Sequence, residues 1–212
     1  MGFVRHTIST MGTLYEGNGE LAIDLANTLE LRRDGSTVDL LADQDGLARW
    51  LRHAGGPGGP SDSGGLNDSG GSGGTSGPGG TGGGDKIAAE QLQALRGHVR
   101  ALLGAAVRQR PLPRAAVTAV NRAAAGAPAV VQLEAGELVV RYDASPGDAF
   151  LADVATSAIG TVGGPRRDRL RRCGAPGCGR WLVASRPRQR WCSPNCGNRA
   201  RVARFQQRHR AG

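Results

Sequence analysis

Four cysteines, the only ones among the 212 residues, limit how this chain can fold more than any other feature. They form two close pairs, Cys173 with Cys178 and Cys192 with Cys196, and glycine or proline stands beside each pair. Such residues favour tight turns that point two sulfurs at one centre. The spacing is therefore typical of a tetrahedral zinc site with four thiolate ligands, and it disfavours two disulfides or four free thiols.

The compartment expected from the sequence also favours metal binding. The first residues lack the apolar core of a signal peptide, and no stretch approaches the roughly 18 apolar residues of a membrane helix. We therefore expect a cytoplasmic protein with no membrane partner, whose thiols stay reduced and free to bind metal. One zinc ion per chain would be structural, because four thiolates leave no open position for a reacting water.

The positive charge of the chain is concentrated at its C-terminal end. The net charge is +9, yet residues 166–212 hold fourteen arginines and a single acid, Asp168, so the remainder is net acidic. This asymmetry favours a nucleic-acid-binding end on a near-neutral body, and a solvated basic tail is the alternative. We therefore divide the chain into a body, residues 1–165, and a basic cysteine module, residues 166–212.

The body is predicted to be mainly helical, because apolar residues recur at helical spacing in five segments. These are residues 20–31, 44–53, 86–109, 112–126 and 149–160. Asp43 and Asp148 stand where N-caps are expected. Two β-rich runs flanking Ala135 and Gly136 predict a hairpin, and a short N-terminal strand is also expected. The fold class is therefore α+β: a mostly helical body with a β-hairpin, followed by a small zinc-finger module with four cysteine ligands.

Residues 55–84 differ from the rest of the body, because sixteen of these thirty residues are glycine. A segment with so few apolar side chains cannot contribute to a core and is expected to be a flexible coil. We interpret it as an insertion within one domain, since the preceding segment is too short to form its own core and loop closure costs little more as a loop lengthens.

The residues after Cys196 predict a basic helix. Val202 and Phe205 are one helical turn apart, so we expect them to pack on the zinc loops, with Trp181 and Trp191 forming a small core around the metal. Asn198 and Arg199 could read adenine and guanine in a major groove or could brace the zinc site, and both interpretations stay open. The side chains expected to contact phosphates are Arg201, Arg204 and Arg208.

The module resembles a known family. The strings "CGRWL" (178–182), "RWCS" (190–193) and "CGNRARVAR" (196–204) resemble the CGNR zinc finger of bacterial transcription regulators. "LAIDLANTLE" (21–30) and "DLLADQDGLARWL" (39–51) resemble the start of ABATE, the alanine-rich domain that precedes this finger and is described as a stress-induced regulator. The resemblance implies that the four cysteines hold zinc, that the finger binds DNA, and that residues 1–165 sense a ligand or a stress signal.

Three classes of function follow from these patterns. The favoured hypothesis is a DNA-binding transcription regulator, and the alternative is a zinc-stabilised adaptor that binds RNA or an acidic protein partner. An enzyme is not expected, because no histidine lies in a recognisable catalytic motif and every cysteine is in the module. Asp24 and Asn27 fall off the leucine stripe of their helix, so they either line a pocket for an unknown small molecule or belong to a solvated face. A homodimer is compatible with the small footprint of one finger.

Overall fold

The computed structural model describes residues 4–6, 20–32, 34–57, 87 and 89–210. Within these ranges the chain is mostly helical and carries three small antiparallel sheets. The predicted fold class, a mostly helical body with a β-hairpin and a four-cysteine module, is confirmed. The predicted flexible insertion at 55–84 lies outside the described residues from residue 58 onward.

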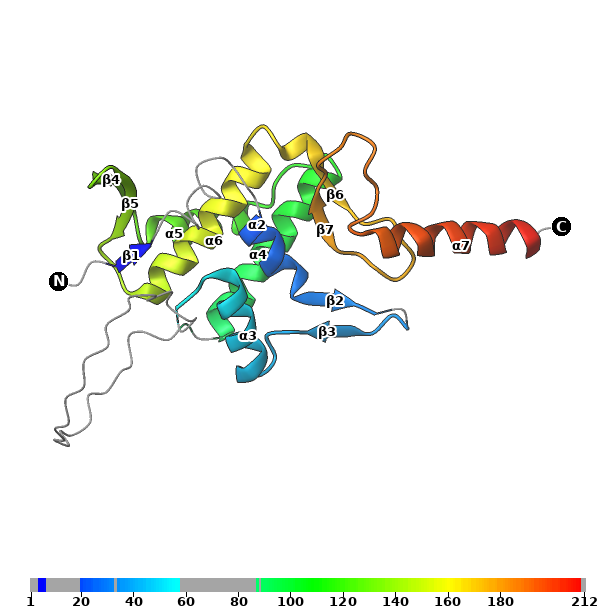
Figure 1. Cartoon of the computed structure of the whole chain (residues 1–212), viewed down its shortest axis with the longest axis horizontal. Coiled ribbons are helices and arrows are strands. Elements are labelled where there is room, and N and C mark those ends of the chain that lie inside the picture. The colour runs from blue at the N-terminus through cyan, green and yellow to red at the C-terminus, as the bar shows by residue number, and fades with distance from the viewer. Residues whose placement is uncertain (1–3, 7–19, 33, 58–86, 88, 211–212) are drawn as a thin grey trace.

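A bundle of helices forms the centre of the body (Figure 1). Its members are α2 (Glu20–Asn27), α3 (Gln44–Ala54), α4 (Ala89–Val107), α5 (Arg114–Ala125) and α6 (Pro146–Gly163). All five correspond to segments predicted from apolar periodicity. Leu25, Leu103 and Val154 of this bundle are completely buried, so the leucine and valine stripes face one shared core.

Two of the helices begin with side-chain caps, one as predicted and one not. Asp43 caps α3, because its Oδ1 accepts a hydrogen bond from the Gly46 amide at 2.6 Å. The cap of α6 is Ser145 rather than the predicted Asp148. The Ser145 hydroxyl accepts from the Asp148 amide at 3.1 Å, and Pro146 takes the first helical position, where its missing N–H costs nothing.

The first helix is shorter than predicted, because the chain turns into a strand after Thr28. Strand β2 (Leu29–Leu31) pairs antiparallel with β3 (Thr37–Asp39), a hairpin that the sequence did not predict. Arg96 of α4 holds this hairpin in place by donating to both carboxylate oxygens of Asp39, at 2.6 and 2.5 Å, and to the Thr28 hydroxyl at 2.9 Å. These hydrogen bonds lower the pKa of Asp39 and satisfy a guanidinium that is buried in the core.

The predicted hairpin lies at the end of the molecule opposite the C-terminus (Figure 1). Strand β4 (Ala129–Glu134) pairs with β5 (Glu137–Tyr142), and β1 (Val4–His6) pairs with the other edge of β5. Ala135 and Gly136 both have positive φ, as a two-residue hairpin turn requires. The Tyr142 hydroxyl donates to the carboxylate of Asp153, which attaches the sheet to α6.

The cysteine module begins with a 3-10 turn (Arg167–Arg169) and a two-stranded hairpin, β6 (Leu170–Arg172) and β7 (Trp181–Val183). It ends in helix α7 (Pro194–Arg210), which projects away from the body (Figure 1). Trp191 packs against the cysteine cluster as predicted. Trp181 does not, because it is buried in the main core of the body together with Leu170. The module is therefore anchored to the body at its hairpin and free of it along α7.

Candidate metal centre and basic helix

The four cysteine sulfurs converge on one point. All four Sγ atoms lie within 4.8 Å of one another, and no disulfide joins these cysteines. The Sγ of Cys192 lies 3.7 Å from that of Cys178 and 3.5 Å from that of Cys196. Zinc–sulfur bonds of about 2.3 Å at tetrahedral angles place ligand sulfurs about 3.8 Å apart, so the cluster has the size of a zinc tetrahedron. The cysteines thus fit one zinc ion.

Local backbone geometry explains why these sulfurs meet. Cys173 and Cys178 lie in the turn between β6 and β7, where Gly177 and Gly179 have φ of 63° and 76°. Residues other than glycine rarely adopt this left-handed backbone conformation, which explains the glycines beside the cysteines. Cys196 lies in the first turn of α7, and the backbone N–H of Cys192 donates to the Cys173 sulfur at 3.4 Å. Such N–H donors stabilise thiolate ligands.

The cluster needs a cation to ionise completely. Burial raises the pKa of Cys178, and burial together with the neighbouring thiols raises the pKa of Cys192 well above its ordinary value. Burial also acts against ionisation of Cys196, but hydrogen bonds from Ser193 and the other cysteines outweigh it and lower the pKa of Cys196. Four thiolates in one small volume repel one another, and a divalent cation at the centre removes this repulsion.

The two signature residues after Cys196 point in different directions. One Nη of Arg199 donates to the Cys196 sulfur at 3.1 Å, and Arg199 Nε is buried without a hydrogen-bond partner. Asn198 is exposed, and its side-chain oxygen accepts from Arg201 at 2.7 Å. Of the two alternatives left open by the sequence, the structure places Arg199 on a zinc ligand and Asn198 on the outer surface of α7.

Helix α7 presents a surface that the sequence did not predict. Val202 and Phe205 were expected to pack inward, but they are 56% and 55% exposed. Ala200 takes that place instead, buried between the cysteines and Trp191. Small side chains at the packed face let the helix approach the metal closely, and the larger apolar side chains consequently face solvent.

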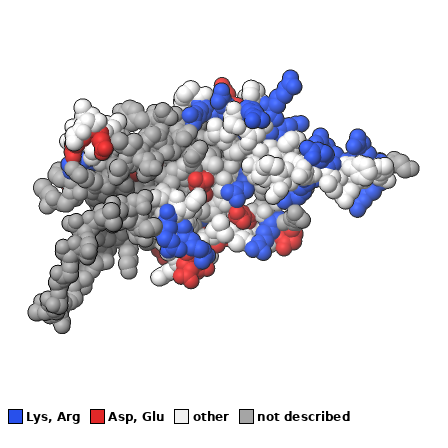
Figure 2. Space-filling model, in the orientation of Figure 1, with Lys and Arg blue, Asp and Glu red and all other residues white. Residues whose placement is uncertain are grey.

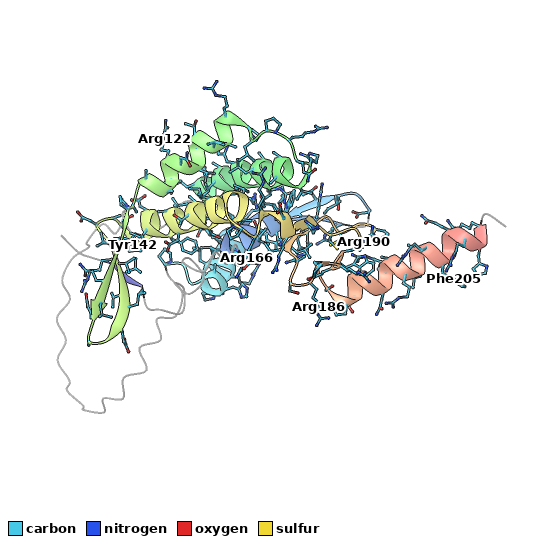
Figure 3. The ribbon with its side chains drawn as sticks, turned by 90° about the horizontal axis from the view of Figure 1, so that it is seen from above. Arg122, Tyr142, Arg166, Arg186, Arg190 and Phe205 are labelled. Carbon is cyan, nitrogen blue, oxygen red and sulfur yellow. The ribbon has the colours of Figure 1, made fainter. Side chains whose placement is uncertain are left out.

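The outer surface of the module is strongly basic, as the blue side chains along α7 show (Figure 2). Arg201, Arg204 and Arg208 are exposed and line one concave strip of the helix. Arg204 also lies over the Trp191 ring, at 5.9 Å from its centroid. In Figure 3, Arg190 lies near the start of the helix, so positive charge extends from α7 onto the preceding loop. The three arginines predicted to contact phosphates are thus available to a ligand.

The junction between body and module is specific. Asn27 at the end of α2 pairs with the backbone of Trp181: its Nδ2 donates to the carbonyl at 3.1 Å, and its Oδ1 accepts from the N–H at 2.8 Å. Arg180 forms an ion pair with Glu30 at 3.1 Å. Asn27 is 7% exposed, so it is not part of a solvated face. The sequence had singled out Asn27 for its polar position, but nothing local revealed its partner 154 residues away.

A groove of about 720 Å³ lies along this junction. Asp24 and Asn27 contribute to its wall from the body, and Arg180 and Arg199 contribute from the module. The two residues that the sequence suggested for a ligand pocket are therefore brought together at the rim of a concavity. The zinc ligands Cys178, Cys192 and Cys196 also border it, so the groove joins the body to the metal centre.

A further side chain supports the junction without a signal in the sequence. Arg100 of α4 donates to the carbonyl oxygens of Ala26 and Leu29 at 2.5 and 3.2 Å, which satisfies the C-terminal end of α2. Burial lowers the pKa of Arg100, and Arg172 and Arg96 nearby lower it further. This arginine fixes the end of α2, where Asn27 holds the module.

Comparison with known families gives two matches. Residues 19–165, more than half of the chain, match the ABATE family, described as "Putative stress-induced transcription regulator". Residues 169–209 match the CGNR zinc finger. A comparison with curated proteins gives no match. Among the described residues, no helix is long and apolar enough to cross a membrane.

Proposed function

Because the chain belongs to the ABATE family and carries a CGNR zinc finger, we propose that it is a transcription regulator that binds duplex DNA through helix α7. The observation that carries this proposal is the charge of that helix. α7 contains five arginines and no acid, and it projects from the body into solvent (Figures 1 and 2). A projecting helix of this kind can enter a major groove, which is about 12 Å wide.

The zinc ion gives this helix a fixed base. Cys173, Cys178, Cys192 and Cys196 would hold the ion, which supplies structural stability and leaves no position for a substrate. Cys196 lies in the first turn of α7, so metal binding fixes the start of the helix relative to the β6–β7 hairpin. Arg199 contributes to this base by donating to the Cys196 sulfur. On this proposal the protein is a cytoplasmic DNA-binding protein and not an enzyme.

Exposed arginines supply most of the binding free energy. Arg201, Arg204 and Arg208 face solvent along α7, and each phosphate contact releases condensed counterions from DNA. Because Arg199 is turned toward the zinc site, we assign phosphate contacts to these three and to Arg210 beyond them. Each contact contributes about −0.9 to the slope of log affinity against log salt.

An adaptor that binds RNA or an acidic protein is the rival function, since both partners would also be attracted by the arginines. Sequence-specific recognition of single-stranded RNA usually relies on several exposed aromatic side chains that stack on bases. Phe205 is the one tryptophan, tyrosine or phenylalanine of the described module that is more than half exposed. This surface therefore suits a groove of duplex DNA better than a splayed single strand.

The groove at the junction is the candidate for ligand sensing. It has room for a small polar molecule, with Asp24 and Asn27 on one wall and Arg180 and Arg199 on the other. A ligand there would contact the side chain that bonds Cys196 and the side chain that holds Trp181. It could thereby change how firmly α7 is held, which is the differential contact that allostery requires. A thermal-shift screen with small metabolites tests for this ligand, and a hit must also change DNA affinity.

Fluorescence anisotropy with labelled nucleic acids tests the main proposal. The zinc-loaded protein is titrated against random-sequence duplex DNA at several salt concentrations, and structured RNA and single-stranded DNA are then added as competitors. We expect duplex binding that weakens steeply with salt and is displaced best by duplex competitor. Absence of duplex binding at low salt would refute the proposal, and stronger displacement by RNA would favour the adaptor.

A further inference from the structure

Helix α7 carries an exposed stripe that the phosphate contacts do not explain. Asn198, Val202, Phe205 and His209 follow one another at spacings of four, three and four residues, so they share one side of the helix. All four are exposed, and the Phe205 and His209 rings are in contact, with centroids 4.2 Å apart. Figure 3 shows Phe205 toward the outer end of α7, away from the body. We call these four residues the outer stripe.

The outer stripe lies opposite the packed face of the helix. Ala200 and Ala203 lie about half a turn away, where Ala200 is buried against Trp191 and the cysteines. Two half-exposed apolar side chains at one helical turn are unusual in a helix whose other exposed side chains are mostly arginine and glutamine. The attachment of α7 to the metal centre determines that this side of the helix faces solvent, but it does not explain why the side carries large apolar residues. Their presence there points to a partner.

Arginines border the outer stripe on both sides. Helical geometry of about 100° per residue puts Arg201 and Arg208 along one edge, and Arg210 along the other beside Gln206. The outer stripe thus has an apolar and amide centre with cationic edges. This is the arrangement that suits a helix in a major groove, where the centre faces base edges and both edges face phosphates.

Charge decides between two possible occupants of this face. A second copy of α7 would bring five further arginines against the first five with no acid to neutralise them. Duplex DNA supplies negative charge on both walls of the groove and apolar thymine methyl groups at its floor. The cationic edges therefore favour DNA and disfavour self-association through this helix.

We infer that the outer stripe reads A·T base pairs, with Val202 and Phe205 contacting thymine C5-methyl groups and Asn198 pairing with adenine. This inference rests on the proposed function and specifies the sequence class of its target. Asparagine can bond adenine N6 and N7 in the major groove, and apolar side chains there recognise the thymine methyl. The Asn198 amide nitrogen is available for such a bond, since Arg201 uses the side-chain oxygen.

Replacement of thymine by uracil in the bound duplex tests the inference, because it removes only the methyl groups. Target duplexes are first selected from a random pool with the full-length zinc-loaded protein, and their affinities are then compared with and without the replacement. We expect selected duplexes to contain A·T pairs and to lose about fourfold in affinity for each contacted methyl group. The Phe205→Ala variant should bind thymine and uracil duplexes with a smaller difference than the wild-type protein.

The controls separate this inference from the proposed function. Leu133→Ala removes an apolar side chain that is 78% exposed on β4, far from α7, and should leave the thymine preference unchanged. Zinc content and helicity of the Phe205→Ala variant verify that its finger is folded. Salt-dependent binding with equal affinity for the thymine and uracil duplexes would overturn the inference that α7 contacts thymine methyl groups. The proposed function would remain intact. Absence of duplex binding would overturn both.

Discussion

Helices α6 and α7 are nearly equal in length but owe their stability to different sources. α6 (Pro146–Gly163) is enclosed by other helices, and most of its side chains are buried. α7 (Pro194–Arg210) is mostly exposed, and its buried residues all lie in its first two turns, at the metal centre. Packing in the core therefore stabilises α6. The cysteine cluster instead fixes the start of α7 and leaves the rest of its surface exposed to a partner. Replacement of packed side chains in α6 should therefore reduce stability, whereas replacement of exposed side chains in α7 should reduce binding and leave stability nearly unchanged.

Removal of zinc should produce the largest effect, and it should act on α7 and the loop that precedes it. The apparent free energy of structural zinc binding in finger peptides is about 10–16 kcal/mol at neutral pH. We therefore expect a strong chelator, or Cys196→Ser, to unfold the segment after residue 184 and to abolish duplex binding. The helices of the body should stay folded, because their core lies outside the cysteine cluster. Hydrogen exchange with and without zinc measures both regions, and protected α7 amides in the zinc-free protein would contradict this account.

Each of the two helices contains one phenylalanine, and the two differ in burial. Phe150 of α6 is 1% exposed and packs edge-on against Trp50, with ring centroids 5.7 Å apart, whereas Phe205 of α7 is 55% exposed. Phe150→Ala should reduce the free energy of unfolding by about 3–5 kcal/mol. Phe205→Ala should change it by no more than about 0.5 kcal/mol. Urea unfolding of both variants measures these changes. Similar losses of unfolding free energy at the two positions would mean that Phe205 is packed in solution.

The pair between Asn27 and Trp181 connects the two regions. Asn27→Ala removes both hydrogen bonds from the Trp181 backbone, and we expect a cost of about 2 kcal/mol. Hydrogen exchange of the Trp181 amide should accelerate by about 30-fold if it occurs through local opening of the junction. Asn121→Ala, at an exposed asparagine of α5, is the control and should leave this amide unchanged. Unchanged exchange in Asn27→Ala would show that the junction is held by other contacts.

A buried carboxyl of α6 should make body stability depend on pH. Burial raises the pKa of Asp153 from 3.8 to about 6, although the hydrogen bond from Tyr142 opposes this rise. Because the folded-state pKa is the higher one, the wild-type protein should gain stability as pH falls from about 7 toward 4. Asp153→Asn retains an acceptor for the Tyr142 hydroxyl, and it should be more stable than wild type by about 3 kcal/mol above pH 7.

The contribution of Asp153 is measured by thermal unfolding of the two proteins across this pH range and down to pH 3. The curves should converge near pH 3, below the unfolded-chain pKa of 3.8, where the wild-type carboxyl is mainly protonated in both folded and unfolded chains. Parallel curves, with the same difference at every pH, would show that Asp153 does not titrate in this window.

Features set by neighbours in the chain were predictable from the sequence. The spacing of the cysteines, the cap at Asp43 and the turn at Ala135 and Gly136 each depend on a few adjacent residues. The body helices followed from their apolar periodicity. The class of the site, a four-cysteine zinc finger with a basic helix, could therefore be predicted from local patterns.

Features set by distant partners were not predictable. Leu29 continues the leucine stripe of α2, so periodicity gave no reason to expect strand β2, which depends on Arg96 and Asp39 from elsewhere in the chain. The spacing of Val202 and Phe205 predicts one apolar side of a helix but not which way that side faces. That direction is set by the packing of Ala200 against the metal centre, which only the three-dimensional structure reveals.

The central claim, that the arginines of α7 contact DNA phosphates, is tested most directly by the salt dependence of duplex binding. Arg201, Arg204 and Arg208 are replaced together by glutamine, and the control is the same replacement of Arg110, Arg114 and Arg122, which are exposed on the body. We expect the α7 variant to reduce the steepness of log affinity against log salt by about 2.7, and the control to leave it nearly unchanged. Equal slopes in the two variants would contradict the assignment of α7 as the DNA-binding element.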